Sequence, residues 1–241
     1  MAGIQSGIKS KERVQQHGEV FTPDSIVNDM LDLTEKGFDT SDYKNYIKRT
    51  YLEPSCGNGN FLLRILDRKL AAVQQLPETE QRLEIIKAFS SIYGVDIQSD
   101  NVEESKKRML ELLENGVIEV LELPNTPIKA FRFKKFDEAI INDVKVHVKY
   151  ILDRNIQHGN TLNGKGGKGC DTDNCSTDLI ITEYIWNGET VTMREIPFND
   201  LLSNLVIDEY VKHYTELKSV EKVAGRRNRK VARTEFDEYD F

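Results

Sequence analysis

The stretch LEPSCGNGNFL, residues 52–62, constrains the fold more than any other part of the chain. The apolar run TYL leads into it, two glycines form a turn, and the helical pattern FLLRILDRKL follows. A strand that enters a helix through a Gly-x-Gly turn is typical of ligand-binding α/β folds, because the turn lets the backbone approach a ligand closely. Residue 62 is Leu, so the third glycine of a dinucleotide fingerprint is missing, which favours a different ligand.

The regions around this turn alternate between strand and helix patterns, which predicts an α/β fold with a parallel sheet. We expect a helical N-terminal segment at 1–49, an α/β core at 50–162, and a loop, a β-hairpin and a helical, charged C-terminal segment at 163–241. Strands are expected at 50–55, 90–96 and 155–162, and helices at 22–37, 60–75, 78–89, 99–116, 135–152 and 199–224.

Two local patterns make sharper predictions about individual elements. Asn187-Gly188 between two β-rich runs predicts a hairpin over 179–196. Asp100 and Glu103, three residues apart, predict a capping box at the start of the helix that ends at Gly116.

Composition narrows the class of protein. The chain has 241 residues, a net charge of −7 and a pI near 5.3, which argues against a protein that mainly coats nucleic acid. Its three cysteines form no extracellular framework, its first twenty residues are polar, and no apolar run approaches the ~20 residues of a membrane span. We therefore expect a cytoplasmic protein with reduced thiols.

The residues at the strand ends indicate the ligand. The backbone at Ser55–Gly57 can lie against an amino-acid tail, and Glu53 can face its ammonium group. Asp96 ends the next strand, where a carboxylate can accept hydrogen bonds from ribose hydroxyls. An adenosine with a charged amino-acid tail and no phosphate points to S-adenosylmethionine.

Four motifs in order extend this interpretation to a resemblance over roughly residues 12–162. They are GEVFTP at 18–23, LEPSCGNGNFL at 52–62, YGVDIQSDNV at 93–102 and IQHGNTL at 156–162. Together they resemble N6-adenine DNA methyltransferases of restriction–modification systems, in the group whose cofactor motifs precede the catalytic motif. The resemblance implies a Rossmann-like S-adenosylmethionine-dependent methyltransferase fold, with a parallel sheet that would be incomplete in this chain and an added β-hairpin.

The resemblance also implies a set of cofactor-binding residues. Thr22 and Pro23 would lie near the carboxylate of the cofactor, Glu53 would bind its amino end, and Asp96 would hold the ribose. Ile97 would pack on the adenine, and Asn160 stands where the family usually has an Asp that accepts from the adenine amino group. The loop beneath the methionine part would comprise Ser55, Cys56, Gly57 and Gly59, and the neighbouring Pro54 and Phe61 would also bind the cofactor.

The family's catalytic motif, Asn/Asp-Pro-Pro-aromatic, is absent. In the family it accepts hydrogen bonds from the target amino group and stacks on the flipped base. The chain has six prolines and no two are adjacent, and the nearest imitation is Glu195-Ile196-Pro197-Phe198. The final residues, EFDEYDF, resemble the phrase that commonly precedes the motif, so we expect the chain to stop where catalysis would begin.

Two functions therefore stay open. The chain is part of an adenine-specific DNA methyltransferase completed by a partner chain with the catalytic motif and target recognition, or it is a non-catalytic S-adenosylmethionine-binding module or regulatory subunit. In either case we expect the chain alone to be inactive. The first strand would be left at a sheet edge, which predicts a homo-oligomer or a partner chain, or the C-terminal residues, against it.

Three other patterns in the sequence resemble known ligand-binding motifs. Cys170 and Cys175, with His158, Asp171, Asp173 and Asp178 nearby, depart from the usual C-x₂-C spacing, so we expect no metal. The two GKG repeats lack the Lys-Ser/Thr of a phosphate loop. The basic run RRNRKVAR predicts contacts with DNA phosphates, against the alternative of a solvated helix face. Its candidate contacts are Arg226, Arg227, Arg229, Lys230 and Arg233.

Overall fold

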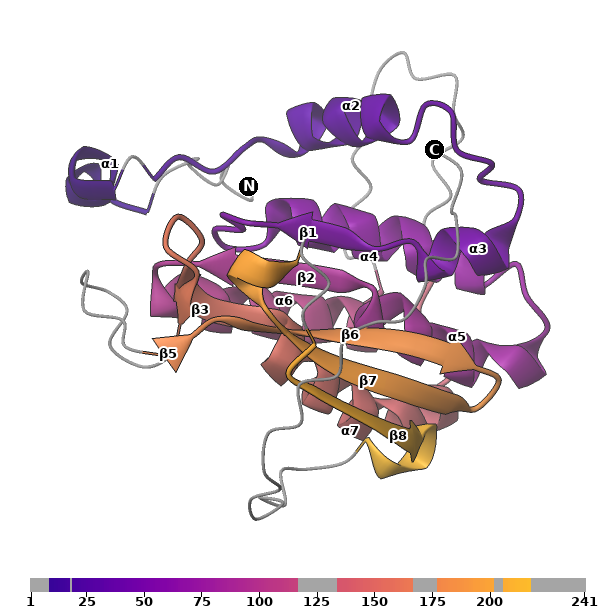
Figure 1. The fold of residues 1–241 in the computed structure, drawn as a ribbon. Helices are drawn as coiled ribbons and strands as arrows, with labels where there is room; N and C mark the ends of the chain where they lie inside the picture. Colours follow the sequence, from indigo (N-terminus) through magenta and orange to yellow (C-terminus); the bar gives the residue numbers. More distant parts are fainter. Residues whose placement is uncertain (1–8, 18, 117–133, 167–176, 202–205, 218–241) are drawn as a thin grey trace.

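The computed structural model describes residues 9–17, 19–116, 134–166, 177–201 and 206–217 (Figure 1). At its centre lies a five-stranded sheet in the order β1-β2-β3-β4-β5. The first three strands are parallel, with Leu52 opposite Tyr93 and Gly94 opposite Ile156, and the last two pair antiparallel. The strands are β1 (Tyr51–Glu53), β2 (Ile92–Asp96), β3 (Ile156–Asn160), β4 (Lys165–Gly166) and β5 (Thr177–Asp178).

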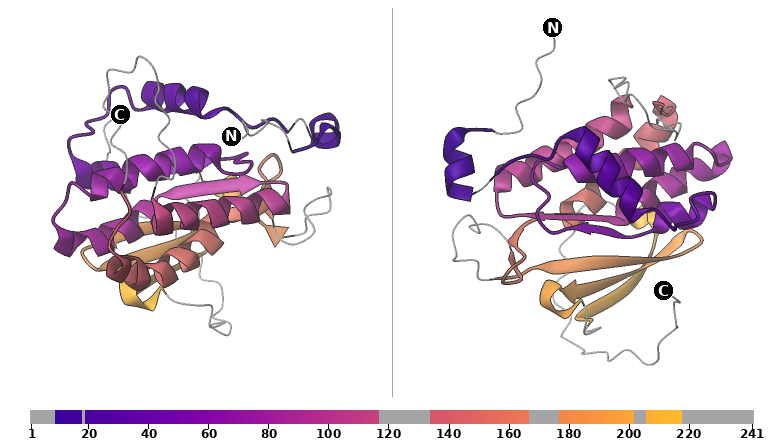
Figure 2. Two further views of the ribbon diagram at one scale, coloured as in Figure 1. Left: turned by 180° about the vertical axis from the view of Figure 1, so that it is seen from behind. Right: turned by 90° about the horizontal axis from the view of Figure 1, so that it is seen from above.

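A layer of helices covers one face of the parallel strands (Figure 2). Helices connect β1 to β2 and β2 to β3, because parallel neighbours need a crossover. Their apolar sides, including Leu62, Phe89 and Ile151, are fully buried against the sheet and one another. The helices are α1 (Lys11–His17), α2 (Asp24–Thr34), α3 (Tyr43–Lys48), α4 (Asn60–Val73), α5 (Glu78–Ser90), α6 (Ser99–Asn115) and α7 (Glu138–Asn155).

A second, antiparallel sheet covers the opposite face of β1 to β3, as the two views in Figure 2 show. Neighbouring residues of β2 demonstrate the two faces. The hydroxyl of Tyr93 donates to the carbonyl of Thr182 at 2.8 Å, whereas a Cβ at Gly94 would lie 2.7 Å from Leu62 of α4. The second sheet consists of β6 (Ile180–Asn187), β7 (Thr190–Pro197) and β8 (Asp208–His213), with short 3₁₀ turns at Phe198–Asp200 and Tyr214–Glu216.

The single tryptophan ties the second sheet to helix α5. The indole Nε1 of Trp186 donates to Ser90 Oγ at 2.9 Å, at the end of α5. Beside it, a cavity of about 360 Å³ lies between the two sheets. Its walls include Thr50, which precedes β1, Leu52 of β1 and Ile196 of β7.

Most elements agree with the sequence patterns. The hairpin forms as predicted, with Asn187 opposite Thr190 and Gly188 at a φ of 59°. The three parallel strands and the helices between them fall within a few residues of their predicted bounds. Helices α1 and α3 were not predicted.

Two predictions were wrong. The described part of 199–224 is not a helix, because β8 pairs along β7 from Thr190 opposite His213 to Glu195 opposite Asp208. This pairing outweighs the local helical pattern, as tertiary contacts often do. The capping box is also absent, since Gln98 is the N-cap of α6 and Asp100 turns instead toward Lys9 and Arg13.

None of the helices in the described ranges combines the length and the apolar character that a membrane crossing requires.

Candidate functional site

The ends of β1, β2 and β3 bring three predicted residues to one edge of the sheet. Glu53, Asp96 and Asn160 are each the last residue of their strands, and parallel strands place these ends together. The hydroxyl of Thr161 donates to the carbonyl of Pro54 at 3.1 Å and links the segments that follow β1 and β3. The structure therefore assembles this part of the predicted site from segments about one hundred residues apart in the chain.

The glycine loop between β1 and α4 requires its two glycines. Gly57 and Gly59 have φ angles of 52° and 89°, in the left-handed region that disfavours side chains. A Cβ at Gly59 would also lie 2.8 Å from Ser105 Oγ of α6. The loop thus approaches α6 closely and presents the N-terminus of α4 beside the strand ends.

Asp96 is nearly fully buried and holds the glycine loop in place. Its Oδ2 accepts from the backbone N–H of Gly57 at 2.8 Å. Its Oδ1 accepts from the backbone N–H of Gln98 at 2.8 Å and from the side-chain amide of Asn101 at 3.2 Å. A carboxylate has about four acceptor positions, and three donors already use the carboxylate of Asp96. One acceptor position therefore remains for a ligand hydroxyl.

Glu53 differs from Asp96 because, among the described residues, the backbone N–H of Ser55 is the hydrogen-bond partner of its carboxylate. Burial raises its pKa above the ordinary value of 4.5, while a backbone hydrogen bond from Ser55 lowers it. Within the described part of the chain no cation lies at ion-pair distance from this side chain. A half-buried carboxylate without a neighbouring cation is suited to bind a positively charged group of a ligand.

Cys56 lies beneath the loop as a buried thiol. Burial, followed by the charge of Asp96, raises its pKa. The thiol therefore stays protonated near neutral pH, and packing against Gly94 is its visible contribution. Phe61, in the first turn of α4, is half-buried and packs against the core.

The GEVFTP segment reaches the same loop from the N-terminal side. The side-chain amide of Asn60 donates to the carbonyl of Thr22 at 2.9 Å. The ring of Phe21 lies so close to Gly57 that a Cβ there would be 3.2 Å from it. Pro23 is the N-cap of α2 and is exposed.

At the far side of the site, two predicted residues have local partners. Asn160 Oδ1 accepts from the backbone N–H of Leu162 at 2.9 Å, within the turn after β3. Ile97 is partly exposed, and its carbonyl lies 2.9 Å from His158 Nε2. The structure thus places Ile97 where an apolar surface faces outward, whereas the oxygen of Asn160 is already used in the turn.

Sequence reasoning missed three residues of α6 that support the site. Asn101 bonds to Asp96, Ser105 Oγ donates to the carbonyl of Gly57 at 3.0 Å, and Arg108 donates to the carbonyl of Asn58 at 2.6 Å. Their spacing of four and three residues puts them on one face of the helix. In the sequence, polar residues on the face of this helix that turns toward the sheet could have indicated that the helix supports the site.

Several other predicted residues lie away from this edge. Pro197 ends β7 opposite Ile180, and Ile196 lines the cavity between the sheets. Cys170 and Cys175, with Asp171 and Asp173, are outside the described residues. So are the predicted DNA contacts Arg226, Arg227, Arg229, Lys230 and Arg233.

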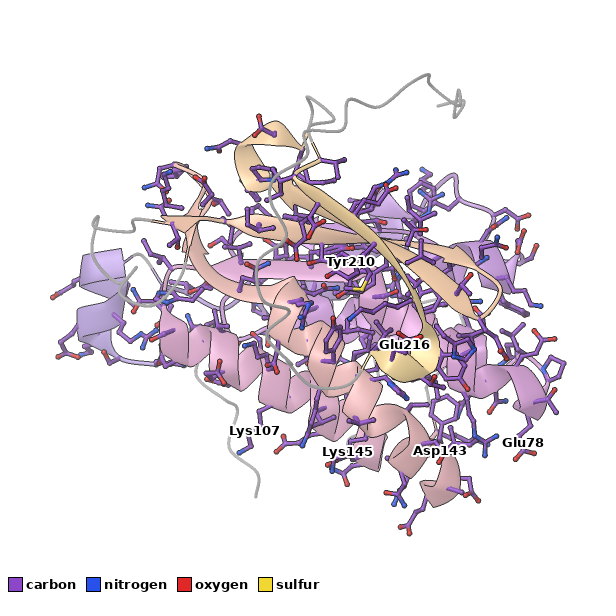
Figure 3. All side chains as sticks on the ribbon, turned by 60° about the horizontal axis from the view of Figure 1, so that its bottom comes forward. Glu78, Lys107, Asp143, Lys145, Tyr210 and Glu216 are labelled. Carbon is purple, nitrogen blue, oxygen red and sulfur yellow. The ribbon has the colours of Figure 1, made fainter. Side chains whose placement is uncertain are left out.

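The described helical face carries mixed charge. Figure 3 labels Lys107, Asp143 and Lys145 on the helices α6 and α7. Lys107 pairs with Glu111 at 3.7 Å, Lys145 pairs with Glu114, and Asp143 pairs with Arg82. Both labelled lysines therefore lie beside acidic partners, which gives this part of the face a mixed charge.

Comparison with known proteins adds no assignment, since no protein-family model and no curated protein matches the chain.

Proposed function

We propose that this chain binds S-adenosylmethionine at the carboxyl ends of β1, β2 and β3, in a Rossmann-like methyltransferase fold. The observation that carries the proposal is the half-buried Glu53 without a described cation, next to the left-handed glycine loop. The cofactor offers an ammonium group for the carboxylate and a chain slim enough to lie along the loop. One of its ribose hydroxyls suits the remaining acceptor position of Asp96.

Each group has a distinct task in this proposal. Glu53 would bind the ammonium group, the backbone around Gly57 would lie along the methionine part, and Ile97 would give the adenine an apolar surface. When bound, the cofactor supplies an electrophilic methyl group. The chain's own residues orient it and restrict water around its amino-acid end.

The four sequence motifs support the proposal that the whole system is an N6-adenine DNA methyltransferase of a restriction–modification system, acting in the cytoplasm. A partner chain would then supply the Pro-Pro-aromatic motif and the recognition of DNA, because no two prolines of this chain are adjacent. The same absence favours the second candidate, a non-catalytic S-adenosylmethionine-binding module or regulatory subunit.

Titration calorimetry with S-adenosylmethionine tests the cofactor assignment. We expect one site, and a Glu53→Gln variant should bind about tenfold or more weakly, because it loses a hydrogen-bonded charge pair worth about 1.5–3 kcal/mol. The affinity of the unaltered protein should fall as the pH falls through the raised pKa of Glu53, since the protonated carboxyl carries no charge. Glu53→Gln should lack this pH dependence.

A matched control is Glu103→Gln, on the exposed side of α6. It should bind like the unaltered protein. Equal affinities of Glu53→Gln and Glu103→Gln would remove Glu53 from the site, and no binding by the unaltered protein would refute the cofactor proposal.

Methyl transfer separates the two candidate functions. With tritiated S-adenosylmethionine and unmethylated DNA, the chain alone should incorporate no label, because the groups that position the target nitrogen are absent. If the chain alone methylates DNA and Pro197→Ala abolishes this activity, the expectation is wrong and the active site lies at the end of β7.

A further inference from the structure

The N-terminal segment lies against α6 and the glycine loop in two described pieces, residues 9–17 with α1 and residues 19–23. We call these pieces the strap. Phe21 of the strap packs on Gly57, and the carbonyl of Thr22 accepts from Asn60. The strap therefore lies directly on the loop that borders Asp96.

Ion pairs fasten the strap to α6. Lys9 Nζ lies 3.1 Å from Asp100 Oδ2 and 2.7 Å from Glu104 Oε2, and Arg13 Nη1 lies 2.6 Å from Asp100 Oδ2. Arg13 also makes a two-pronged pair with Glu19 inside the strap. The hydrogen bonds from Arg13 and then Lys9 lower the pKa of Asp100 to about 2, despite partial burial.

One amide group connects this cluster to the site. The Nδ2 of Asn101 donates to Glu19 Oε1 at 2.6 Å and to Asp96 Oδ1 at 3.2 Å. An amide NH₂ has two hydrogens, so both bonds form together. The position of Asp96 is thus linked to the position of the strap through a single side chain.

Besides these ion pairs, the hydroxyl of Ser10 supports helix α1 by accepting from the backbone N–H of Arg13. The helix has seven residues, which is too short for a stable isolated helix in water. None of its described side chains is buried. Its helical structure therefore depends on the ion pairs with α6.

From these contacts we propose that the strap is a salt-sensitive closure of the site, latched by Lys9, Arg13, Asp100 and Glu104 and coupled to Asp96 through Asn101. When the latch releases, α1 unfolds, Phe21 leaves the glycine loop, and Asn101 loses the Glu19 acceptor that holds its amide against Asp96. The glycine loop is then uncovered and its bond to Asp96 is held less firmly. Salt favours the open state, because ions screen charges at the surface over about 8 Å at physiological ionic strength.

Hydrogen exchange of the ligand-free protein, followed by mass spectrometry, tests the latch without reference to the proposed function. Exchange in residues 9–17 should accelerate when sodium chloride rises from about 0.05 to about 0.5 M. Asp100→Asn and Arg13→Gln should each accelerate it about fivefold at low salt, the size expected for partly exposed ion pairs. The amide of Gly57, which donates to Asp96, should also exchange faster in Asp100→Asn.

Two controls match these variants. Glu103→Gln removes a neighbouring α6 charge that pairs with Lys106, and Lys11→Gln removes a strap charge outside the cluster. Both should exchange like the unaltered protein. Equal exchange in Asp100→Asn and Glu103→Gln would overturn the latch, and an unchanged Gly57 amide in Asp100→Asn would overturn its coupling to Asp96.

The consequence for ligand exchange rests on the proposed function and has a separate readout. S-adenosylmethionine should dissociate about fivefold faster from Asp100→Asn than from Glu103→Gln, because the strap opens more often. Equal dissociation rates would refute strap-limited release. If the unaltered protein does not bind S-adenosylmethionine, the proposed cofactor is wrong. The hydrogen-exchange experiment on the ligand-free protein tests the latch independently of that result.

Discussion

Lys69 shows how strongly a single residue can connect distant segments of this fold. Its side chain in α4 is fully buried, and its Nζ donates to the carbonyl of Ile47 at 2.7 Å and contacts Ser91 Oγ at 2.6 Å. It also donates to the carbonyl of Arg49. One amine thereby joins the end of α3, the start of β1 and the turn before β2.

We predict that Lys69→Met destabilises the protein by about 1–3 kcal/mol, because buried carbonyl groups lose their donor. Burial lowers the pKa of Lys69 well below 10.5, so the unfolded chain binds more protons between the two pKa values. The free energy of unfolding should therefore rise with pH in this interval, and Lys69→Met should lose that contribution.

Urea denaturation at several pH values measures both effects. Lys107→Met, on the exposed surface of α6, is the control and should change neither the midpoint nor the pH dependence. A Lys69→Met protein with the stability of the control would contradict the assigned role.

At the scale of elements, α6 serves as the support of the glycine loop. Ser105 and Arg108 each donate to a carbonyl of the loop, and Asn101 fixes Asp96. The loop therefore depends on a helix that begins about forty residues later in the chain.

We predict that Gly59→Ala lowers the melting temperature more than Gly188→Ala does. Both glycines have positive φ, so both substitutions introduce backbone strain of roughly 1 kcal/mol. At Gly59 the new Cβ would also meet Ser105 Oγ at 2.8 Å, whereas at Gly188 nothing lies within 4 Å. Equal melting temperatures of the two variants in a thermal scan would show that Ser105 and α6 move aside without loss of stability.

The same elements show what the sequence could and could not predict. The turn at Asn187-Gly188 and the glycine loop were predictable, because their signals lie within a few residues. The strand β8 was missed, since its identity depends on pairing with β7 rather than on its own pattern. Asp100 was assigned to a cap because the partners that hold it, Lys9 and Arg13, lie about ninety residues away.

For the molecule as a whole, the edge at β1 is the feature with the largest consequence. Among the described strands, β1 pairs with β2 alone, and Leu52 is 39% exposed beside the cavity between the sheets. The hairpin begins beside β3 and lies on the face of the sheet rather than along β1 (Figure 1). The outer edge of β1 therefore has no neighbour among the described strands. An apolar edge strand invites a further strand.

We predict self-association, or tight binding of a partner chain, through this edge. Sedimentation at micromolar concentration should show a species heavier than the 27.7 kDa monomer, and Leu52→Glu should reduce it. Val211→Glu, exposed on β8, is the control and should not. A monomer whose Leu52 amide exchanges slowly would mean that the chain covers its own edge.

Trp186 also gives the molecule a built-in optical reporter. It is the one tryptophan of the chain, it donates to Ser90, and it lines the cavity beside β1. Indole fluorescence shifts with the polarity around the ring, so a side chain that displaces water from this cavity should move the emission to shorter wavelength. A ligand at the carboxyl ends of the strands should leave the emission unchanged, and one spectrum can therefore distinguish occupation of the edge from occupation of the site.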